Sequence, residues 1–147
     1  GILEIGEPSP VRVIRKLKEN IDRNKVFIID SPPGTSCSVV ETLRKVDFAI
    51  LVTEPTPFGL HDLKLAVQIV REMGIPFGVV INRDTNSYTM IDEYAGEENL
   101  VLLERIPFDR SIAEAYSEGK LFTETSPSWK IRFKKLAEKI ISSSGVS

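Results

Sequence analysis

Short apolar runs alternate with amphipathic stretches along the whole chain, and this alternation constrains the fold more than any other feature of the sequence. The inner runs are continuously apolar, which is typical of parallel strands that helices cover on both faces. Regular alternation of strand and helix predicts right-handed crossovers and a mostly parallel sheet. We therefore expect an α/β fold with strands at residues 2–5, 26–30, 48–53, 77–82 and 100–107.

The stretches between these runs predict helices. One begins after Ser9, with Pro10 suited to its first turn, and another ends before Gly74, a residue type that is common where helices end. The last helix carries an apolar stripe that starts at Trp129. Beyond the first, we expect helices at residues 60–73, 88–99, 110–118 and 127–143.

The composition is that of one soluble domain of 147 residues, and no linker or internal repeat divides it. The net charge of −2 argues against broad nucleic-acid binding. No apolar run approaches the roughly 20 residues that a membrane-spanning helix needs, so membrane insertion is not expected. The single cysteine, Cys37, excludes an internal disulfide framework and favours a reducing, cytoplasmic setting.

The segment VFIIDSPPGTS (residues 26–36) contains the first candidates for chemistry. Asp30 ends the expected strand, and open α/β sheets bind ligands at the carboxyl ends of their strands. Gly34 in the following turn allows the backbone to approach an anion closely, and the next helix offers free N–H groups. A carboxylate here suits a Mg²⁺ ion held through water, or the orientation of an attacking water. The alternatives are a turn-forming or helix-capping aspartate and a simple turn glycine.

A phosphate-binding loop is absent from the sequence. No GxxxxGK[ST] or related Gly-Lys-Thr pattern occurs in the 147 residues, although such a loop cradles the phosphates in many nucleotide sites. The sequence therefore contains the features of one half of a nucleotide site.

Two later strand ends supply further candidates. Asn82 and Arg83 follow the fourth expected strand, where an amide can pair with the polar edge of a purine and a planar guanidinium can stack on the base. The fifth strand ends in IPFD, in which Pro107 fixes a loop that flanks the same crevice and Asp109 caps the next helix. The alternative is that the Asn-Arg pair merely closes a strand.

Two other features have a functional and a structural interpretation. Thr53, Glu54 and the loop PTPFG (residues 55–59) lie on the same sheet edge, where they shape a partner or switch surface or form only a proline-rich connection. The basic residues of the last helix fit a solvated surface better than a helix that touches a membrane or DNA.

In the segments that contain these residues, the sequence resembles the deviant-Walker-A ATPases of the ParA/MinD group, and most closely the MinD-like branch with an inserted ferredoxin domain. The resemblance covers the chain from about Val26 to the last helix and implies that residues 1–147 are the C-terminal part of one nucleotide-binding domain. It rests on four motifs in the correct order, IIDSPPGTSC, LVTEPTPFGLHDLKLAV, IPFGVVINR and IPFDRSIAEAYSEG.

The resemblance also implies roles for individual residues. The IDxPPG segment is the switch II region of the group, so Asp30 would be a catalytic residue that approaches Mg²⁺ through water, with Pro33 and Gly34 near the terminal phosphate. The asparagine of the INR segment contacts adenine in the group, which maps onto Asn82 with Arg83 beside it. The IPFD loop borders the base and adds three residues to the nucleotide-binding set, Pro107, Phe108 and Asp109.

The cofactors that the resemblance implies are ATP or ADP with Mg²⁺, and [4Fe–4S] clusters only in a part of the parent protein that precedes this sequence. The group binds ATP as dimers, with a lysine of the phosphate loop reaching across the dimer, so we expect a homodimer and an iron–sulfur or redox partner. The loop, its lysines and the cluster cysteines are absent from these 147 residues. The chain by itself is therefore expected to be inactive as an ATPase.

Two functions from different classes remain. The first is an ATP-binding and hydrolysing switch domain whose parent is linked to iron–sulfur chemistry, with this chain holding switch II and the adenine side. The second is a non-catalytic interaction module that kept the fold and lost nucleotide binding. A flavodoxin-like receiver domain is the weakest alternative, because the sequence lacks an acidic cluster at the first strand and a lysine at the fifth.

Overall fold

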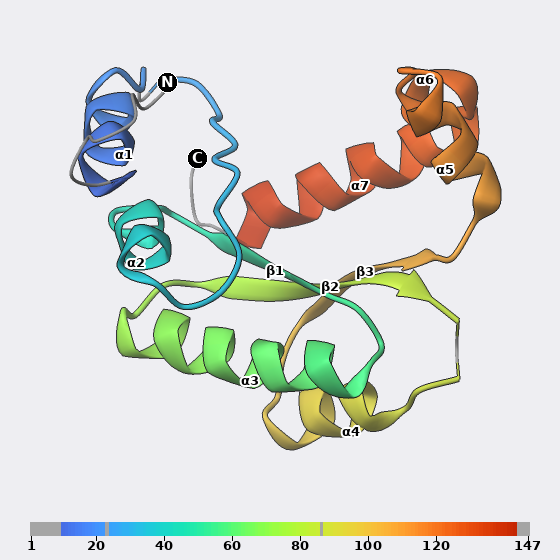
Figure 1. Ribbon diagram of the computed structural model, residues 1–147, viewed down its shortest axis with the longest axis horizontal. Coiled ribbons are helices and arrows are strands. Elements are labelled where there is room, and N and C mark those ends of the chain that lie inside the picture. Colours follow the sequence, from blue (N-terminus) through green and yellow to red (C-terminus); the bar gives the residue numbers. More distant parts are fainter. Residues whose placement is uncertain (1–9, 23, 86, 144–147) are drawn as a thin grey trace. The chain divides into compact units, whose positions relative to one another are not determined.

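The computed structural model describes residues 10–22, 24–85 and 87–143, and the chain divides into two units, Gly1–Val46 and Asp47–Ser147. Figure 1 shows the elements of each unit, from α1 to α7. The strand expected at residues 2–5 and the expected helix cap at Ser9 lie outside the described residues.

Among its described residues, the first unit contains two helices, α1 (Pro10–Glu19) and α2 (Cys37–Leu43). α1 begins at Pro10, which confirms the predicted start, because proline lacks an N–H group that the first turn would leave unbonded. Cations of α1 hold the two helices together. Arg15 donates to both carboxylate oxygens of Glu41, at 2.9 and 3.2 Å, and Lys18 donates to the Thr42 carbonyl at 2.6 Å. Lys18 thereby satisfies a carbonyl that has no partner within α2.

The prediction of a strand at residues 26–30 is wrong, because this segment is irregular in the structure. Val26 and Ile28 expose 74% and 91% of their surface. β-Branched and aromatic residues favour a strand only where a neighbouring strand completes the hydrogen bonding and another layer covers one face. No strand among the described residues pairs with this segment. Strand-forming composition is therefore not sufficient here.

A three-stranded parallel sheet, in the order β1-β2-β3, organises the second unit. Its strands are β1 (Ala49–Thr53), β2 (Phe77–Asp84) and β3 (Leu102–Pro107). β2 lies in the middle, so that Val79 pairs with Leu51 on one side and with Leu102 on the other. The predicted α/β fold with a mostly parallel sheet is confirmed for this unit.

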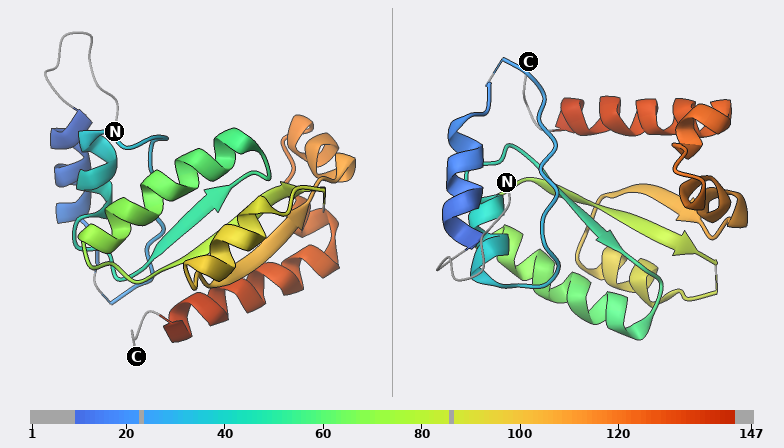
Figure 2. Two further views of the ribbon diagram at one scale, coloured as in Figure 1. Left: turned by 90° about the horizontal axis from the view of Figure 1, so that it is seen from below. Right: turned by 45° about the horizontal axis from the view of Figure 1, so that its top comes forward.

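Helices cover both faces of this sheet, as Figure 1 and the left view of Figure 2 show. α3 and α4 lie on one face and α7 lies on the other. The predicted helices are confirmed with small shifts of their ends, whereas α6 was not predicted. Gly74 follows α3 with φ +65°, the left-handed conformation typical of a glycine that ends a helix. The helices of the unit are α3 (Pro57–Glu72), α4 (Met90–Glu97), α5 (Arg110–Ser117), α6 (Phe122–Thr125) and α7 (Pro127–Ser143).

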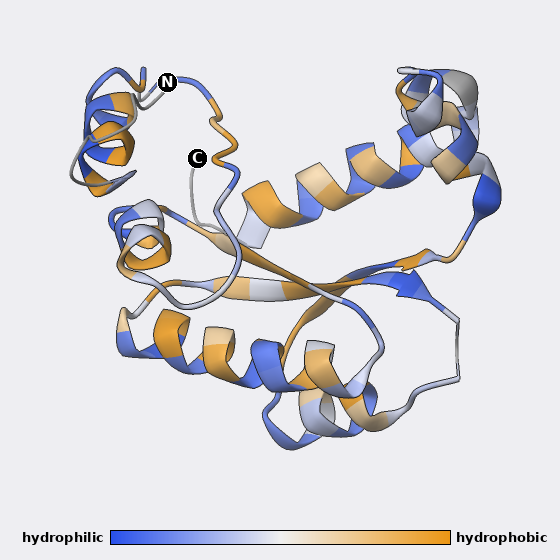
Figure 3. Ribbon diagram, in the orientation of Figure 1, coloured by the Kyte–Doolittle hydropathy of each residue, from blue (hydrophilic) through white to orange (hydrophobic). Residues whose placement is uncertain are grey.

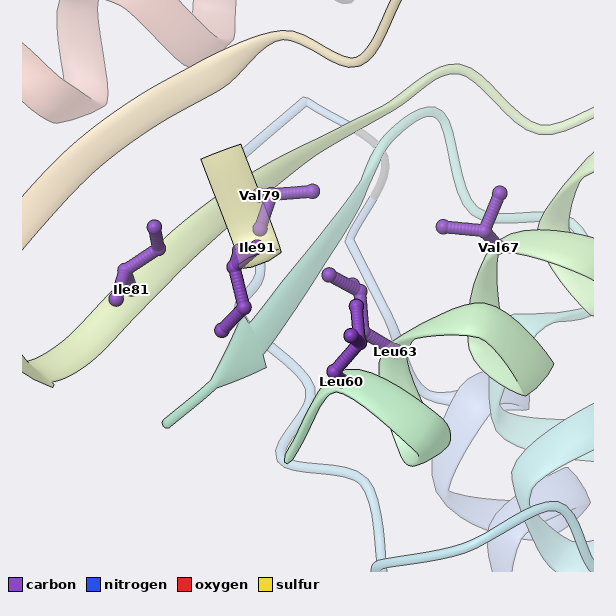
Figure 4. Packing of buried hydrophobic residues seen from close by; sticks show 6 residues of the cluster. All are labelled: Leu60, Leu63, Val67, Val79, Ile81 and Ile91. Atoms are coloured by element: carbon purple, nitrogen blue, oxygen red, sulfur yellow. The ribbon is translucent and has the colours of Figure 1, made fainter. Parts of the chain in front are cut away.

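The core lies between the sheet and the layer formed by α3 and α4. Spacings of three and four residues place the apolar side chains of α3 on one face of the helix, and Val79 and Ile81 share one face of β2 because side chains alternate along a strand. Figure 3 shows hydrophobic residues recurring along α3 and through β1 and β2. The cluster shown in Figure 4 consists of Leu60, Leu63, Val67, Val79, Ile81 and Ile91.

A bulge in β3 shapes the opposite face of the sheet. Val79 pairs with Leu102, but Val80 pairs with Glu104, so Leu103 is an extra residue in the strand. Such a bulge leaves one residue unpaired and redirects the side chains around it. Glu104 consequently pairs with Val80, whose side chain lies on the face away from the core.

α7 is fastened to this bulge by two cations. Arg132 donates to the carboxylate of Glu104 and to the backbone carbonyl of Arg105, both at 2.7 Å. Lys139 donates to the backbone carbonyl of Leu102 at 3.1 Å. Hydrogen bonds that involve a charged group are stronger than neutral ones. Charge-assisted bonds thus hold α7 along β3.

The Glu104–Arg132 pair predicts a stability that depends on pH. The hydrogen bond from Arg132 holds the pKa of Glu104 below its usual range. A lowered folded-state pKa gives stability that is present above the unfolded-state pKa of about 4.3 and is lost as the pH falls through the folded-state value. We expect Glu104→Gln to lower the free energy of unfolding by about 1 kcal/mol at pH 7 and by less in acid.

Urea unfolding at pH 7 and at pH 3 measures this difference. The control is Glu138→Gln, which removes an exposed carboxylate 3.9 Å from Lys134 on the same helix and should have a smaller effect. A loss of stability from Glu104→Gln that is the same at both pH values would contradict the assignment.

The turn between β1 and α3 leaves no room for a side chain at Gly59. The Thr53 hydroxyl donates to the Gly59 carbonyl at 2.8 Å, and the Gly59 N–H donates to the side chain of Thr56, the N-cap of α3, at 2.9 Å. A Cβ at Gly59 would stand 2.1 Å from the backbone oxygen of Glu54. The close packing of the turn against α3, and with it the position of Glu54, therefore requires glycine at this place.

We expect Gly59→Ala to lower the free energy of unfolding by about 2 kcal/mol, because the turn must open to admit the methyl group. Gly96→Ala in α4 is the matched control, since a Cβ there meets nothing within 4 Å. Alanine is favoured over glycine inside a helix by about 0.5–1 kcal/mol, so the control should be stabilised. Chemical denaturation measures the free energy of unfolding of both variants, and an equal change in the two would contradict the steric argument.

Candidate functional site

The carboxyl ends of β2 and β3 bring together most of the predicted site residues. Asn82 and Arg83 lie near the end of β2, and Pro107 ends β3. The Phe108 N–H donates to the backbone carbonyl of Asp84 at 3.0 Å, which ties the two strand ends together. Asn82 is half-buried.

Arg83 links the ends of all three strands. Its Nη1 lies 3.6 Å from a carboxylate oxygen of Glu54, which directly follows β1, and its Cζ lies 5.3 Å from the centroid of the Phe108 ring. The backbone of Arg83 has φ +55°, a left-handed conformation that is uncommon and strained for a residue with a side chain. The Phe108 residue is 54% exposed. A planar cation and an aromatic ring thus face each other at the surface of this edge.

A buried carboxylate fixes the strand end next to Arg83. The Asp84 side chain is only 5% exposed and accepts a hydrogen bond from Arg105 of β3 at 2.8 Å. Arg105 also pairs with Asp92 of α4. The planar guanidinium carries five N–H donors and can serve two carboxylates at once. This Asp84–Arg105–Asp92 clamp joins β2, β3 and α4, and sequence patterns gave no signal for it.

Asp109 caps α5, as predicted. Its carboxylate accepts hydrogen bonds from the hydroxyl and from the backbone N–H of Ser111, both at 2.8 Å. These two bonds hold the pKa of Asp109 below its usual range. The cap fixes the course of the chain directly after Phe108, and so it contributes to the shape of the IPFD loop.

The other predicted site residues, Asp30, Pro33 and Gly34, lie in the first unit and are exposed. Gly34 has φ +88°, a conformation that glycine adopts readily and other residues rarely do, which agrees with the predicted glycine-dependent turn. Asp30 differs from the prediction, because it follows an irregular segment and does not end a strand. α2 begins two residues after Thr35, and its N-cap Ser36 makes no side-chain capping bond.

No group of three or more His, Cys, Asp and Glu residues that could hold a metal ion occurs in residues 10–22, 24–85 and 87–143. Mg²⁺ keeps several of its waters in proteins and takes one or two carboxylates. An exposed carboxylate such as that of Asp30 therefore fits contact with Mg²⁺ through water. Within the same described part of the chain, every helix is too short or too polar to cross a membrane.

The clamp predicts that Arg105 matters for stability. Arg105→Met would remove a cation that pairs with the buried Asp84 carboxylate, and breaking a buried pair in this way is expected to cost about 3 kcal/mol of unfolding free energy. Arg71→Met is the matched control, because Arg71 pairs with Glu98 at the surface. Loss of this pair should lower the free energy of unfolding by less than about 1 kcal/mol. Guanidinium chloride unfolding at pH 7 compares the two, and equal losses would show that the clamp is not buried.

The sequence matches a protein family over residues 7–141, and the description of this family is ParA: NUBPL iron-transfer P-loop NTPase. An iron-sulfur cluster carrier protein of Pyrococcus horikoshii is 31% identical over 153 residues, which cover 91% of this chain and 52% of that protein. An uncharacterized protein of Methanocaldococcus jannaschii is 33% identical over 124 residues, which cover 83% of this chain and 43% of that protein. The chain thus spans about half the length of the curated relatives it matches.

A solved structure is similar in fold. The cell division ATPase MinD of Pyrococcus furiosus superposes with a TM-score of 0.71 and 29% sequence identity, covering 90% of this chain and 58% of that chain. This likeness agrees with the parallel sheet and its covering helices, and the family match extends over most of the sequence. The chain therefore belongs to the ParA-type family of NUBPL iron-transfer P-loop NTPases.

Proposed function

We propose that this chain holds the base-binding side and the switch segment of an ATP-binding switch domain, in a protein that hydrolyses ATP in connection with iron–sulfur chemistry. One observation carries the proposal. The half-buried Asn82 directly precedes Arg83 in β2, and Arg83 and Phe108 form an exposed pair at the carboxyl edge of the parallel sheet. This is the edge at which open α/β sheets bind their ligands.

The side chains at this edge fit a purine base. The Asn82 amide offers one donor and one acceptor side by side, which is the combination that pairs with adenine. The guanidinium of Arg83 is planar and stacks well on aromatic rings. Pro107 stiffens the loop that contains Phe108 and Asp109, and this loop would border the base site.

The segment from Asp30 to Gly34 is the proposed switch. Bound Mg²⁺·ATP supplies the phosphoryl group and the cation that neutralises its charge. Asp30 would hold the metal through a water molecule, and Pro33 and Gly34 would lie near the terminal phosphate. The φ of +88° at Gly34 supports a backbone that can approach an anion closely.

The phosphate contacts of the proposed site need donors that these 147 residues do not supply. No GxxxxGK[ST] phosphate loop occurs in the sequence, so we propose that this loop and its lysine come from polypeptide outside it. We also propose that the active form is a homodimer. Positioning and electrostatic stabilisation provide most of the catalysis of phosphoryl transfer. The 147 residues alone are therefore expected to hydrolyse ATP poorly or not at all.

The proposed link to iron–sulfur chemistry comes from the name of a relative, the iron-sulfur cluster carrier protein of Pyrococcus horikoshii. A [4Fe–4S] cluster is held by four cysteine thiolates in most proteins. The sequence contains one cysteine, the exposed Cys37. Cluster ligands would therefore come from other parts of the parent, from a second copy or from a partner protein, with the cluster as cargo.

A second candidate function is a non-catalytic interaction module. One observation favours it, because Ile50 and Val52 of β1 are 42% and 63% exposed. Exposed apolar side chains on a strand at the edge of the described sheet suit contact with another protein. This function would need no nucleotide, and the same binding experiment separates the two candidates.

Calorimetric titration of the chain with Mg²⁺·ATP and with Mg²⁺·ADP tests the proposal. We expect weak binding of both nucleotides, and we expect Asn82→Ala to weaken it about tenfold, because a paired amide discriminates a base by about 1–3 kcal/mol. Asn24→Ala, which removes an exposed amide in the first unit, is the control and should leave the affinity unchanged.

The two negative outcomes have different meanings. Equal affinities of Asn82→Ala and the unchanged chain would contradict a base site at the end of β2. Absence of binding for both nucleotides, with the chain folded, would favour the interaction module.

A further inference from the structure

Arg83 contacts the carboxylate of Glu54 and the ring of Phe108, and these contacts indicate different roles for Glu54 and Phe108. We infer that Arg83 is the fixed wall of a base slot, by which we mean the place beside its guanidinium where a purine would stack. Glu54 is the positioning residue that holds Arg83. The Phe108 ring occupies the slot until a purine base displaces it. This inference rests on the proposed function and adds to it the order of events at the same site.

Arg83 is held from several directions. Its backbone is set at φ +55°, and the next residue, Asp84, is clamped by Arg105 and accepts a hydrogen bond from the Phe108 N–H. Its guanidinium is attracted to the Glu54 carboxylate 3.6 Å away. The Arg83 side chain is 58% exposed, so its orientation is restricted by the fixed backbone and by the Glu54 contact and not by burial. Arg83 is therefore pre-organised to stack.

Glu54 is itself held in place by the turn that follows β1. A Cβ at residue 59 would stand only 2.1 Å from the backbone oxygen of Glu54, so the turn fits closely against Gly59. The Thr53 hydroxyl donates to the Gly59 carbonyl at 2.8 Å and fastens the turn to α3. The fold thus fixes the backbone of Glu54, and its carboxylate, which is 45% exposed, can orient Arg83 without touching the base.

The Phe108 ring is the movable member. The Arg83 Cζ lies 5.3 Å from the ring centroid. A base stacked between the two would need two contacts of about 3.5–4 Å each, or about 7 Å in total, so a base does not fit while the ring stays. Phe108 is 54% exposed, and a cation–π contact at an exposed site is weak. The ring can therefore separate from Arg83 at small cost, whereas Arg83 also pairs with Glu54.

The ligand that this arrangement takes is a planar, neutral ring system of the size of a purine. A guanidinium surface stacks on any aromatic face, and the neighbouring Asn82 amide adds the hydrogen-bonding edge that selects adenine. Phosphates are not needed for this contact. Adenosine is consequently a suitable probe for the 147-residue chain.

The first test uses the chain without ligand. The ring current of Phe108 should shift the side-chain NMR signals of Arg83, and we expect Glu54→Gln to move these signals toward the positions of an unstacked arginine. Glu138→Gln is the matched control, because it removes an exposed carboxylate from an ion pair of similar length, 3.9 Å to Lys134. Unchanged Arg83 signals in Glu54→Gln would overturn the positioning role of Glu54.

The second test is a titration with adenosine, followed by the NMR signals of Asn82, Arg83 and Phe108. We expect the Arg83–Phe108 stacking shift to disappear as adenosine binds. Glu54→Gln should weaken binding about threefold, which is the effect of losing an exposed ion pair. Phe108→Leu should tighten binding about threefold, because it removes the competitor for the slot.

The outcomes separate this inference from the proposed function. If adenosine binds and needs Asn82, but Phe108→Leu weakens binding, then Phe108 is a wall of the occupied slot and the inference fails while the base site remains. If Glu54→Gln leaves the affinity unchanged, the positioning role fails alone. If adenosine moves none of the three signals in the folded chain, the base site itself is absent and both proposals fail.

Discussion

The hydrogen bonding of β2 along both of its edges is the constraint on which the rest of the second unit depends. Because β1 and β3 both run parallel to β2, the three strand ends meet at one edge of the sheet. Arg83 contacts Glu54 and Phe108, which come from two other parts of the sequence, only because this pairing brings the strand ends together. The same strand also anchors the core, since Val79 and Ile81 are buried completely or almost completely.

The fold was predictable where a local pattern decides it. The apolar runs at residues 48–53, 77–82 and 100–107 contain most of β1, β2 and β3, and Gly74 correctly marked the end of α3. The run at residues 26–30 has the same composition and forms no strand. The difference lies outside the run, because a strand also needs a neighbour to pair with. The short helix α6 lacks a long periodic pattern, and its sequence gave no signal.

The candidate site divides in the same way. The capping of α5 by Asp109 was predictable, because it depends on a partner only two residues away, Ser111. The clamp of Asp84 by Arg105 was not, because it depends on which residues of β2 and β3 lie opposite each other, and both register shifts fall in this region. Sequence patterns placed Glu54 on the correct edge but could not assign it to Arg83. Partners that are distant in sequence become visible only once the register is known.

The fastening of α7 has a consequence for how this chain can vary between species. Lys139 donates to the backbone carbonyl of Leu102, and Arg132 donates to that of Arg105, and every amino acid offers the same carbonyl. The attachment of α7 therefore does not depend on which side chains residues 102 and 105 carry, although Arg105 is needed for its own pairs with Asp84 and Asp92. The attachment does depend on the two cations. Arg132 and Lys139 should therefore be replaced slowly as long as the bulge in β3 is retained.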